Sequence, residues 1–328
     1  MSAPRRLDAL LAEAVAFRGD QLVAPDACVR VVAGAGDGLP GLVVDRFGGL
    51  LVASDYDPAG PGAAVLPVLE AAFPDCAVLV RARRTAGAGA AGAGAAGAAS
   101  AGPTLHWGRR PMPESLVASE DGLRFEIRSD PRHDFGLFLD GRAARARVRA
   151  VAADALVLNL FAYTCGFGVA ARAAGARDVV NVDPDKGYLT WGRRNAALNG
   201  VDFRVVPDTA QVFLRRWRRR HQRAAAEHFD LVVIDPPAFG VGRGDDRVLR
   251  KLWPELLEFV ALAAPAHAVI MCNDKAYFGH AAFEATVADA LGAYQVTAIP
   301  HGPEILGRDP SRTDPWYAPP RVVHATRR

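Results

Sequence analysis

Short apolar runs alternate with helical stretches through the second half of the chain. Five of these runs are each short enough for one buried strand. They lie near Leu156, Val179, Phe203, Leu231 and His267. Residues 295–299 and 322–325 predict a last pair of strands. Strands and helices in regular alternation predict a parallel, doubly wound α/β sheet with right-handed crossovers.

The first part of the chain has a different pattern of apolar and turn residues. Residues 7–17 predict an amphipathic helix, and short β segments separated by turn residues follow between residues 28 and 56. A helix is expected over residues 62–73, a strand over 77–81, and further β structure at Trp107 and over 123–127. We therefore expect a small N-terminal α/β lobe over residues 1–130, with a role in presenting substrate, and a catalytic domain over residues 131–328.

Residues 85–103 are almost entirely alanine and glycine. Such a segment cannot bury enough apolar surface to offset its chain entropy. The composition predicts a disordered insertion in the N-terminal lobe.

Residues 156–183 predict a strand, a tight loop, a helix and a second strand that ends at Asp183. Gly175 is placed where a helix of this length would stop. This order is typical of the first βαβ unit of a nucleotide-binding fold. In such a unit the loop amides and the helix N-terminus face the cofactor, and the acid takes its ribose hydroxyls.

The loop itself leaves two interpretations open. A dinucleotide site needs the pattern G-x-G-x-x-G, whereas this loop has only Gly166 and Gly168, after Tyr163-Thr164-Cys165. S-adenosylmethionine carries no phosphate and tolerates such a loop. The other interpretation is a βαβ unit without a ligand.

A second buried run, residues 231–234, leads directly into Asp235-Pro236-Pro237. Ligands of open α/β sheets bind beyond the carboxyl ends of the strands, so Asp235 is expected at the same crevice. The two prolines fix φ and remove two amide donors, which makes the exit rigid. A rigid carboxylate suits recognition of a planar nitrogen heterocycle, although a solvated acid at a sharp turn would have the same sequence.

Several motifs together resemble one family. They are residues 159–167 (NLFAYTCGF), Asp183, residues 235–239 (DPPAF), residues 136–142 (GLFLDGR) and residues 31–45 (VVAGAGDGLPGLVVD). These motifs resemble the class I S-adenosylmethionine-dependent methyltransferases related to the large-subunit rRNA cytosine-5 methyltransferases. The likeness covers roughly residues 25–275, apart from the alanine- and glycine-rich insertion.

The resemblance implies a Rossmann-like methyltransferase sheet of seven strands, one of them antiparallel, and an enzyme that uses S-adenosylmethionine on RNA, ribosomal RNA in particular. The cofactor residues it implies are Asn159, Phe161, Tyr163, Gly166, Asp183, Asp208, Asp235 and Pro236. The substrate residues it implies are Asp140, Arg142, Pro237 and Phe239. Asp208 would lie beside the adenine, and it could also cap the following helix. The chain departs from the family at Cys165, where many members have glycine, and after the fifth strand, at residues 271–275.

Asp235 and Cys272 are the candidate catalytic residues. The C5 atom of a pyrimidine is a poor nucleophile until a cysteine thiolate adds to C6, and Cys272 ends the fifth strand, where it could meet an extruded base. Free cysteine is also among the most buried residue types, so Cys272 could be a small core residue. The alternative chemistry is then direct transfer to a ring nitrogen. A nicotinamide dehydrogenase and a non-catalytic RNA-binding protein with the same fold are the competing classes.

Charge and cysteine content add little. The net charge is +3, but arginines cluster over residues 215–223 and over residues 142–149. A basic face would give sequence-independent affinity for RNA, or it is simply a solvated helix surface. Four scattered cysteines without zinc spacing fit a reducing cytoplasm and no metal site. No apolar run approaches the ~20 residues that span a bilayer, so no membrane partner is expected.

Overall fold

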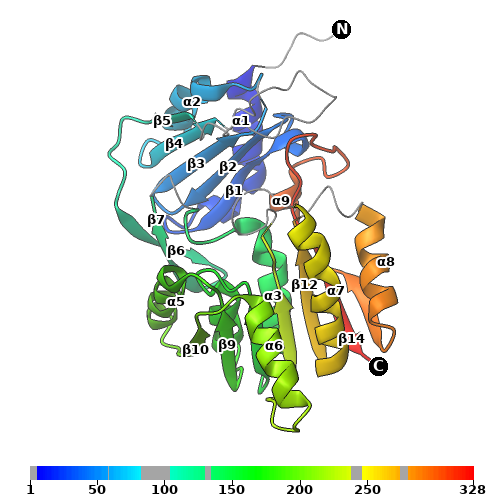
Figure 1. Cartoon of the computed structure of the whole chain (residues 1–328). Coiled ribbons are helices and arrows are strands. Elements are labelled where there is room, and N and C mark those ends of the chain that lie inside the picture. The colour runs from blue at the N-terminus through cyan, green and yellow to red at the C-terminus, as the bar shows by residue number, and fades with distance from the viewer. Residues whose placement is uncertain (1–5, 58, 83–103, 130–133, 238–245, 274–279) are drawn as a thin grey trace. The chain divides into compact units, whose positions relative to one another are not determined.

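The computed structural model describes residues 6–57, 59–82, 104–129, 134–237, 246–273 and 280–328, which form two compact units (Figure 1). The first unit comprises Met1–Gly122, Glu126–Phe135 and His301–Pro319, and the second comprises Leu123–Phe125, Gly136–Pro300 and Pro320–Arg328. The predicted insertion over residues 85–103 lies outside the described residues. Within those described ranges, no helix is both long and apolar enough to cross a bilayer.

The second unit is built on a seven-stranded sheet with the order β10-β9-β8-β11-β12-β14-β13. Its strands are β8 (Leu156–Leu160), β9 (Asp178–Val182), β10 (Arg204–Val206), β11 (Leu231–Ile234), β12 (His267–Cys272), β13 (Tyr294–Ala298) and β14 (Arg321–Arg327). Neighbouring strands from β10 to β12 run parallel, and β14 runs antiparallel to both β12 and β13. The expected parallel α/β sheet is confirmed, and the run predicted at each strand position forms a strand.

Helices cover both faces of this sheet. They are α3 (Arg142–Val151), α4 (Gly166–Ala173), α5 (Lys186–Leu198), α6 (Ala210–His221), α7 (Asp246–Ala263) and α8 (His280–Ala290). Leu158 and Leu160 of β8 belong to a core cluster with residues of α6, α7 and α8. The helices α6 and α7 lie side by side in Figure 1. Asn159 points to the opposite face, because side chains alternate along a strand. On that face α4 packs against β8 and β9.

The first unit holds a five-stranded sheet with the order β1-β2-β3-β4-β5. Its strands are β1 (Cys28–Ala33), β2 (Leu42–Phe47), β3 (Leu50–Asp55), β4 (Ala77–Ala82) and β5 (Thr104–Trp107), and its helices include α1 (Leu7–Arg18) and α2 (Leu66–Ala72). Both helices contribute to one apolar core with the inner strands. The hairpin of β6 (Ser115–Glu120) and β7 (Leu123–Arg128) forms a separate two-stranded sheet, and the division between the units runs through β7.

The segment between β13 and β14 belongs to the first unit, whereas the sequence predicted that all residues after 130 belong to the catalytic domain. Residues His301–Pro319, which include α9 (Pro303–Leu306), belong to the first unit although they follow most of the second. The Asp314 carboxylate accepts the backbone N–H groups of Ala35, at 2.8 Å, and Gly41, at 2.9 Å. A boundary placed once, near residue 130, misses this segment because its hydrogen bonds join residues that are far apart in sequence.

A fully buried ion pair also holds this segment. The Arg18 guanidinium contacts both carboxylate oxygens of Asp37 at 2.8 Å, and neither side chain is exposed. Asp37 further accepts the backbone N–H of Ala33, at 2.7 Å, and that of Arg308, at 3.2 Å. The remaining Arg18 donors bond to backbone oxygens, including that of Glu304 at 3.1 Å. Buried charges of this kind are tolerated only where each group has partners, as it does here.

Candidate active site

The carboxyl ends of β8 to β12 meet at one edge of the second unit. Because these five strands are parallel, the residues that follow them gather at that edge. The strand order reverses between β8 and β11, with β9 and β10 on one side and β12 on the other. In open α/β sheets this switch point is where ligands bind.

The loop after β8 has an unusual backbone. Phe161, Tyr163 and Cys165 all have positive φ, at 60°, 49° and 61°, although none is glycine. Such left-handed residues cost about 1–3 kcal/mol each and cluster at ligand sites. The loop is held by hydrogen bonds, among them that from the Tyr163 N–H to the Asp183 carboxylate, at 2.9 Å. The predicted cofactor loop is therefore a fixed, strained turn.

Asp183 sits directly beyond β9. Its second carboxylate oxygen accepts the N–H of Asp185 at 2.9 Å. Burial raises the pKa of Asp183, although these two backbone hydrogen bonds act in the opposite direction. Each carboxylate oxygen can accept more than one hydrogen bond, so Asp183 has capacity left for ligand hydroxyls.

Close packing fixes the start of α4 against the sheet. A Cβ atom on Gly168 would lie 2.4 Å from the side-chain oxygen of Asn181, so this position requires glycine. The same Asn181 oxygen accepts a hydrogen bond from the Asn159 amide at 2.8 Å, and both side chains are fully buried. Asn159, expected to bind the cofactor, thus lies beneath the loop and within the sheet. Gly166 begins α4, and Gly175, with φ +88°, follows its end as expected.

Asp208 follows β10 and forms an ion pair with Arg216. The helix α6 is capped by Thr209, whose hydroxyl accepts the Val212 N–H at 3.3 Å. The prediction that Asp208 caps this helix is therefore wrong, because the cap falls one residue later.

Asp235 lies at the tip of β11, followed by Pro236, which is buried, and Pro237, which is exposed. Burial and, next, the charge of Asp140 raise the pKa of Asp235 to about 7, while the Arg145 guanidinium acts to lower it. A carboxyl group with this pKa is present in both protonation states at neutral pH.

Two neighbours of Asp235 had no separate prediction. The Asn273 amide donates to the Asp235 carboxylate at 3.5 Å, a long hydrogen bond. Arg145 is buried and donates to the Phe138 carbonyl at 2.9 Å. Asn273 could have been found from its place after the fifth strand. Arg145 could not, because arginine in a basic helix is usually exposed.

The predicted substrate residues fall into two groups. Asp140 lies in the 3-10 turn Leu139–Gly141, Arg142 begins α3 directly after it, and both residues are half-buried. Asp140 acts on Asp235 through its charge, which places it at the same edge of the sheet. Phe239, the remaining substrate candidate, lies outside the described residues, whereas Pro237 closes the described part of this turn.

Cys272 ends β12, and its side chain is 2% exposed. It belongs to the core cluster that also holds Ile270 and Phe283. This position fits a small core residue. Its role as a nucleophile stays a prediction.

The last turn of α6 lies away from this edge, whereas Arg216, earlier in the helix, pairs with Asp208 at the edge itself. The helix begins near the carboxyl edge, after β10, and runs back along the sheet, so its last turn, with Arg218 and Arg220, reaches the amino edge. Arg204, at the start of β10, pairs there with Glu227, which follows α6. Arg218 itself pairs with Glu258 at 2.8 Å. These contacts support the interpretation of this cluster as a solvated helix face.

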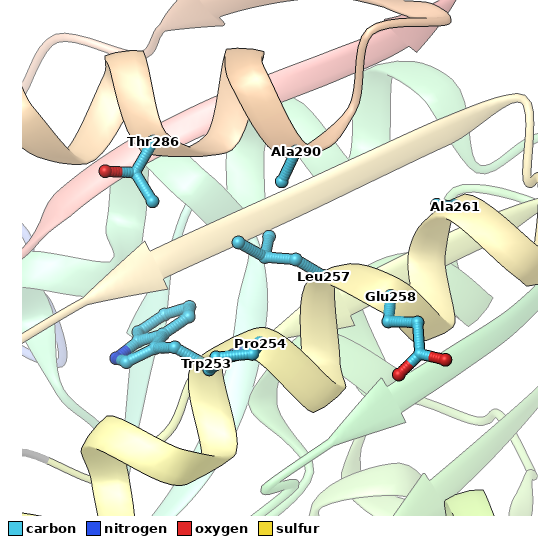
Figure 2. Close-up of a pocket in the computed structure, with 7 residues that line it drawn as sticks. All are labelled: Trp253, Pro254, Leu257, Glu258, Ala261, Thr286 and Ala290. Carbon is cyan, nitrogen blue, oxygen red and sulfur yellow. The ribbon is translucent and has the colours of Figure 1, made fainter.

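A groove of about 440 Å³ lies between α7 and α8. It is lined by Trp253, Pro254, Leu257, Glu258, Ala261, Thr286 and Ala290. Figure 2 shows Leu257 and Ala290 facing each other across it. Because its lining comes from these two helices alone, the groove contains none of the strand-end acids and is not the candidate active site. Among the described residues, no three His, Cys, Asp or Glu side chains gather as a metal site would require.

Comparison with known proteins identifies the family to which the chain belongs. A family model described as S-adenosylmethionine-dependent methyltransferase matches residues 102–314. The chain belongs to this family of methyltransferases. The expected enzyme class and the expected cofactor, S-adenosylmethionine, are thereby confirmed.

Curated relatives of the methyltransferase match its central part. The ribosomal RNA large subunit methyltransferase I of Klebsiella pneumoniae (strain 342) is 35% identical over 219 residues, which are 64% of this chain and 50% of that protein. The protein of the same name from Erwinia tasmaniensis is 33% identical over 223 residues, 64% of this chain and 51% of its own. The chain thus spans about half the length of the curated relatives it matches.

Solved structures share the fold of the methyltransferase over almost its whole length. SMU.776, a methyltransferase complexed with SAH, superposes with a TM-score of 0.77 at 18% identity, covering 99% of this chain and 84% of that one. A SAM-dependent methyltransferase from Agrobacterium tumefaciens gives a TM-score of 0.64 at 19% identity, covering 92% and 90%.

Proposed function

We propose that the protein transfers the methyl group of S-adenosylmethionine to a base of RNA, and that ribosomal RNA is its substrate. The observation that carries this proposal is Asp235, a half-buried acid with a pKa of about 7 at the switch point of the sheet. Relatives that are 33–35% identical to the chain over 64% of its length are named as ribosomal RNA large subunit methyltransferases.

On this proposal the β8 and β9 side of the edge holds the cofactor. The loop of Phe161 and Tyr163, with the N-terminal turn of α4 at Gly166, would surround its amino-acid end, and Asp183 would accept its ribose hydroxyls. Asp208 would lie beside the adenine, and Asn159 would support the loop from below. Bound S-adenosylmethionine supplies the electrophilic methyl group.

The β11 side then holds the base. Asp235 in its protonated form can donate a hydrogen bond to a ring nitrogen, and in its ionised form it can accept one. The rigid prolines Pro236 and Pro237 fix the direction of this group. Asp140, in the turn before α3, and Arg142, at its start, would contact the same nucleotide, and Phe239 would follow from the turn after β11.

The position that is methylated depends on Cys272. In the cytosine-5 reaction a cysteine thiolate adds to C6, C5 takes the methyl group, a base removes the C5 proton, and the thiolate leaves. The burial of Cys272 in a core cluster favours the second candidate, transfer to a ring nitrogen without a covalent adduct. Cys272→Ala should abolish transfer in the first case. In the second it should cost about 1 kcal/mol of stability and leave the rate nearly unchanged.

The deciding assay is single-turnover transfer of labelled methyl from S-adenosylmethionine to total RNA from a strain that lacks the protein. We expect label in the ribosomal RNA with wild type, and nucleoside mass spectrometry then identifies the base atom. Binding of S-adenosylmethionine without any transfer to RNA would contradict the proposal and would favour a non-catalytic RNA-binding role. Running Cys272→Ala in parallel separates the two chemistries.

A further inference from the structure

An exposed aromatic ring stands beside the cofactor loop. Phe138, just ahead of the short 3-10 turn Leu139–Gly141, is 47% exposed. Its ring centroid lies 5.4 Å from that of Tyr163. Tyr163 in turn lies 4.6 Å from Tyr188 and 6.3 Å from Trp191, both of α5. The Phe138 ring is thus the outer member of a packed aromatic cluster.

The backbone under this ring is fixed. The Phe138 carbonyl accepts hydrogen bonds from the buried Arg145 guanidinium, at 2.9 Å, and from the Gly141 N–H, at 3.2 Å. Two residues earlier, the Gly136 carbonyl accepts the Thr164 hydroxyl at 2.5 Å, which ties the segment to the cofactor loop. An apolar ring on a fixed backbone loses little entropy when a ligand covers it.

The segment around Phe138 also carries groups whose charges act on Asp235. Asp140, two residues after Phe138, raises the pKa of Asp235, and Arg145, which holds the Phe138 carbonyl, lowers it. The segment thus packs on the cofactor loop at Tyr163 through the Phe138 ring, and carries at Asp140 a charge that acts on Asp235. Arg142, four residues after Phe138, supplies a positive charge at the same place, which suits the phosphate of a nucleotide.

We propose that the Phe138 ring, backed by Tyr163, stacks on the face of the RNA base that is presented to Asp235. Every base has a π face, and stacking on an aromatic side chain is a common way to hold a nucleotide out of its strand. This inference rests on the proposed function and adds a binding surface to it. The adenine of the cofactor is the competing ligand for the same ring.

The test compares four variants: Phe138→Ala, Phe138→Leu, Phe138→Trp and Leu262→Ala. Leu262 is the control, because it lies near the end of α7 and is 41% exposed. Binding of a fluorescein-labelled 12-residue single-stranded oligoribonucleotide is measured by anisotropy, with the protein saturated with S-adenosylhomocysteine. Calorimetry gives the affinity for S-adenosylmethionine alone, and thermal unfolding checks that each variant is folded.

We expect Phe138→Ala to weaken oligoribonucleotide binding by about 5- to 100-fold. Phe138→Trp keeps an aromatic ring and should bind the oligoribonucleotide nearly as well as wild type, whereas Phe138→Leu should bind it as weakly as Phe138→Ala. The affinity for S-adenosylmethionine should stay within about twofold of wild type in all variants. In the single-turnover assay, Phe138→Ala should mainly raise the RNA concentration that gives half of the maximal rate of methyl transfer.

Two results would overturn the inference while leaving RNA methylation intact. One is unchanged RNA binding and transfer by Phe138→Ala. The other is a loss of S-adenosylmethionine affinity without a loss of RNA affinity, which would assign the ring to the adenine. A wild-type protein that methylates no RNA would instead remove the proposed function, and the inference with it.

Discussion

Asp37 in the first unit and Asp235 in the second differ in how many partners their carboxylates have. Asp37 is fully buried, both of its oxygens contact Arg18 at 2.8 Å, and it also accepts backbone N–H groups. Asp235 receives, among the described residues, one long hydrogen bond from Asn273, and the charge of Asp140 opposes its ionisation. The first carboxylate has its hydrogen-bonding capacity filled by the protein. The second keeps capacity for a ligand.

A difference of this kind is expected between an acid that stabilises the fold and one that binds a ligand. A buried charge without full compensation costs stability, and it persists where the group has a task in binding or catalysis. Asp183 lies between the two extremes, because it accepts two backbone N–H groups and its pKa is still raised by burial. The same residue type is thus held in three different ways in one chain, and its partners decide how much hydrogen-bonding capacity is left for a ligand.

The largest effect is expected at Asp37, and it concerns the free energy of unfolding. Asp37→Ala leaves the Arg18 guanidinium buried without its counter-ion, so the free energy of unfolding should fall by about 3–5 kcal/mol. Urea denaturation followed by circular dichroism measures this. The matched control is Asp8→Ala, because the Asp8–Arg6 pair is exposed and should contribute less than about 1 kcal/mol. A similar small loss for both variants would break the comparison.

Asp235→Asn should affect the reaction instead. The substitution keeps the size of the side chain but removes the proton that Asp235 exchanges, so single-turnover methyl transfer should slow by about 100-fold or more. Binding of S-adenosylmethionine, measured by calorimetry, should remain. If the variant transferred methyl groups at the wild-type rate, Asp235 would be no more than a strand-end acid.

At Asp183 the expected loss is in cofactor affinity. Asp183→Ala removes the acceptor for the ribose hydroxyls and one anchor of the Tyr163 loop, so S-adenosylmethionine should bind about tenfold more weakly or worse. Calorimetry at fixed pH gives the dissociation constant. Asp185→Ala is the control, since the Asp185 side chain caps α5 and the ribose is not expected to reach it. Equal effects at both positions would argue for a loss of local structure.

The smallest expected effect is on the pH dependence of stability, through the Asp235 carboxyl group. The pKa of Asp235 is about 7 in the folded protein and near its ordinary value of 3.8 in the unfolded chain. The folded state therefore keeps its proton over this range, and stability falls as the pH rises from about 4 to about 7. Asp235→Asn lacks this penalty and should be more stable than wild type by at least about 1 kcal/mol at pH 8, with no gain at pH 4. Denaturation at both pH values measures the difference, and an equal change at both would contradict the assignment.

Local patterns in the sequence predicted most of the second unit. Runs such as those at Val179 and Leu231 are long enough for a single strand, and Asp183 and Asp235 follow them directly, so the strand positions and the acids at their carboxyl ends could be predicted from periodicity. The seven-stranded sheet with one antiparallel strand was expected from the family resemblance. The aromatic ring of Phe138 and the buried Arg145 could not be predicted, because their surroundings come from distant parts of the chain. The helix cap at Thr209 was missed by one residue, since Asp208 and Thr209 are both residue types found at helix N-termini.

The return of residues His301–Pro319 to the first unit has a consequence for the order in which the protein can fold. On the ribosome a chain emerges from its N-terminus, and domains commonly fold one after another as they appear. Here the partners of Asp37 and of the Ala35 and Gly41 amides include Arg308 and Asp314. The first unit to be synthesised therefore lacks part of its own interior until residues His301–Pro319, which follow most of the second unit, have been translated. Its completion therefore follows the synthesis of most of the second unit, so the two units are not completed one after the other in chain order.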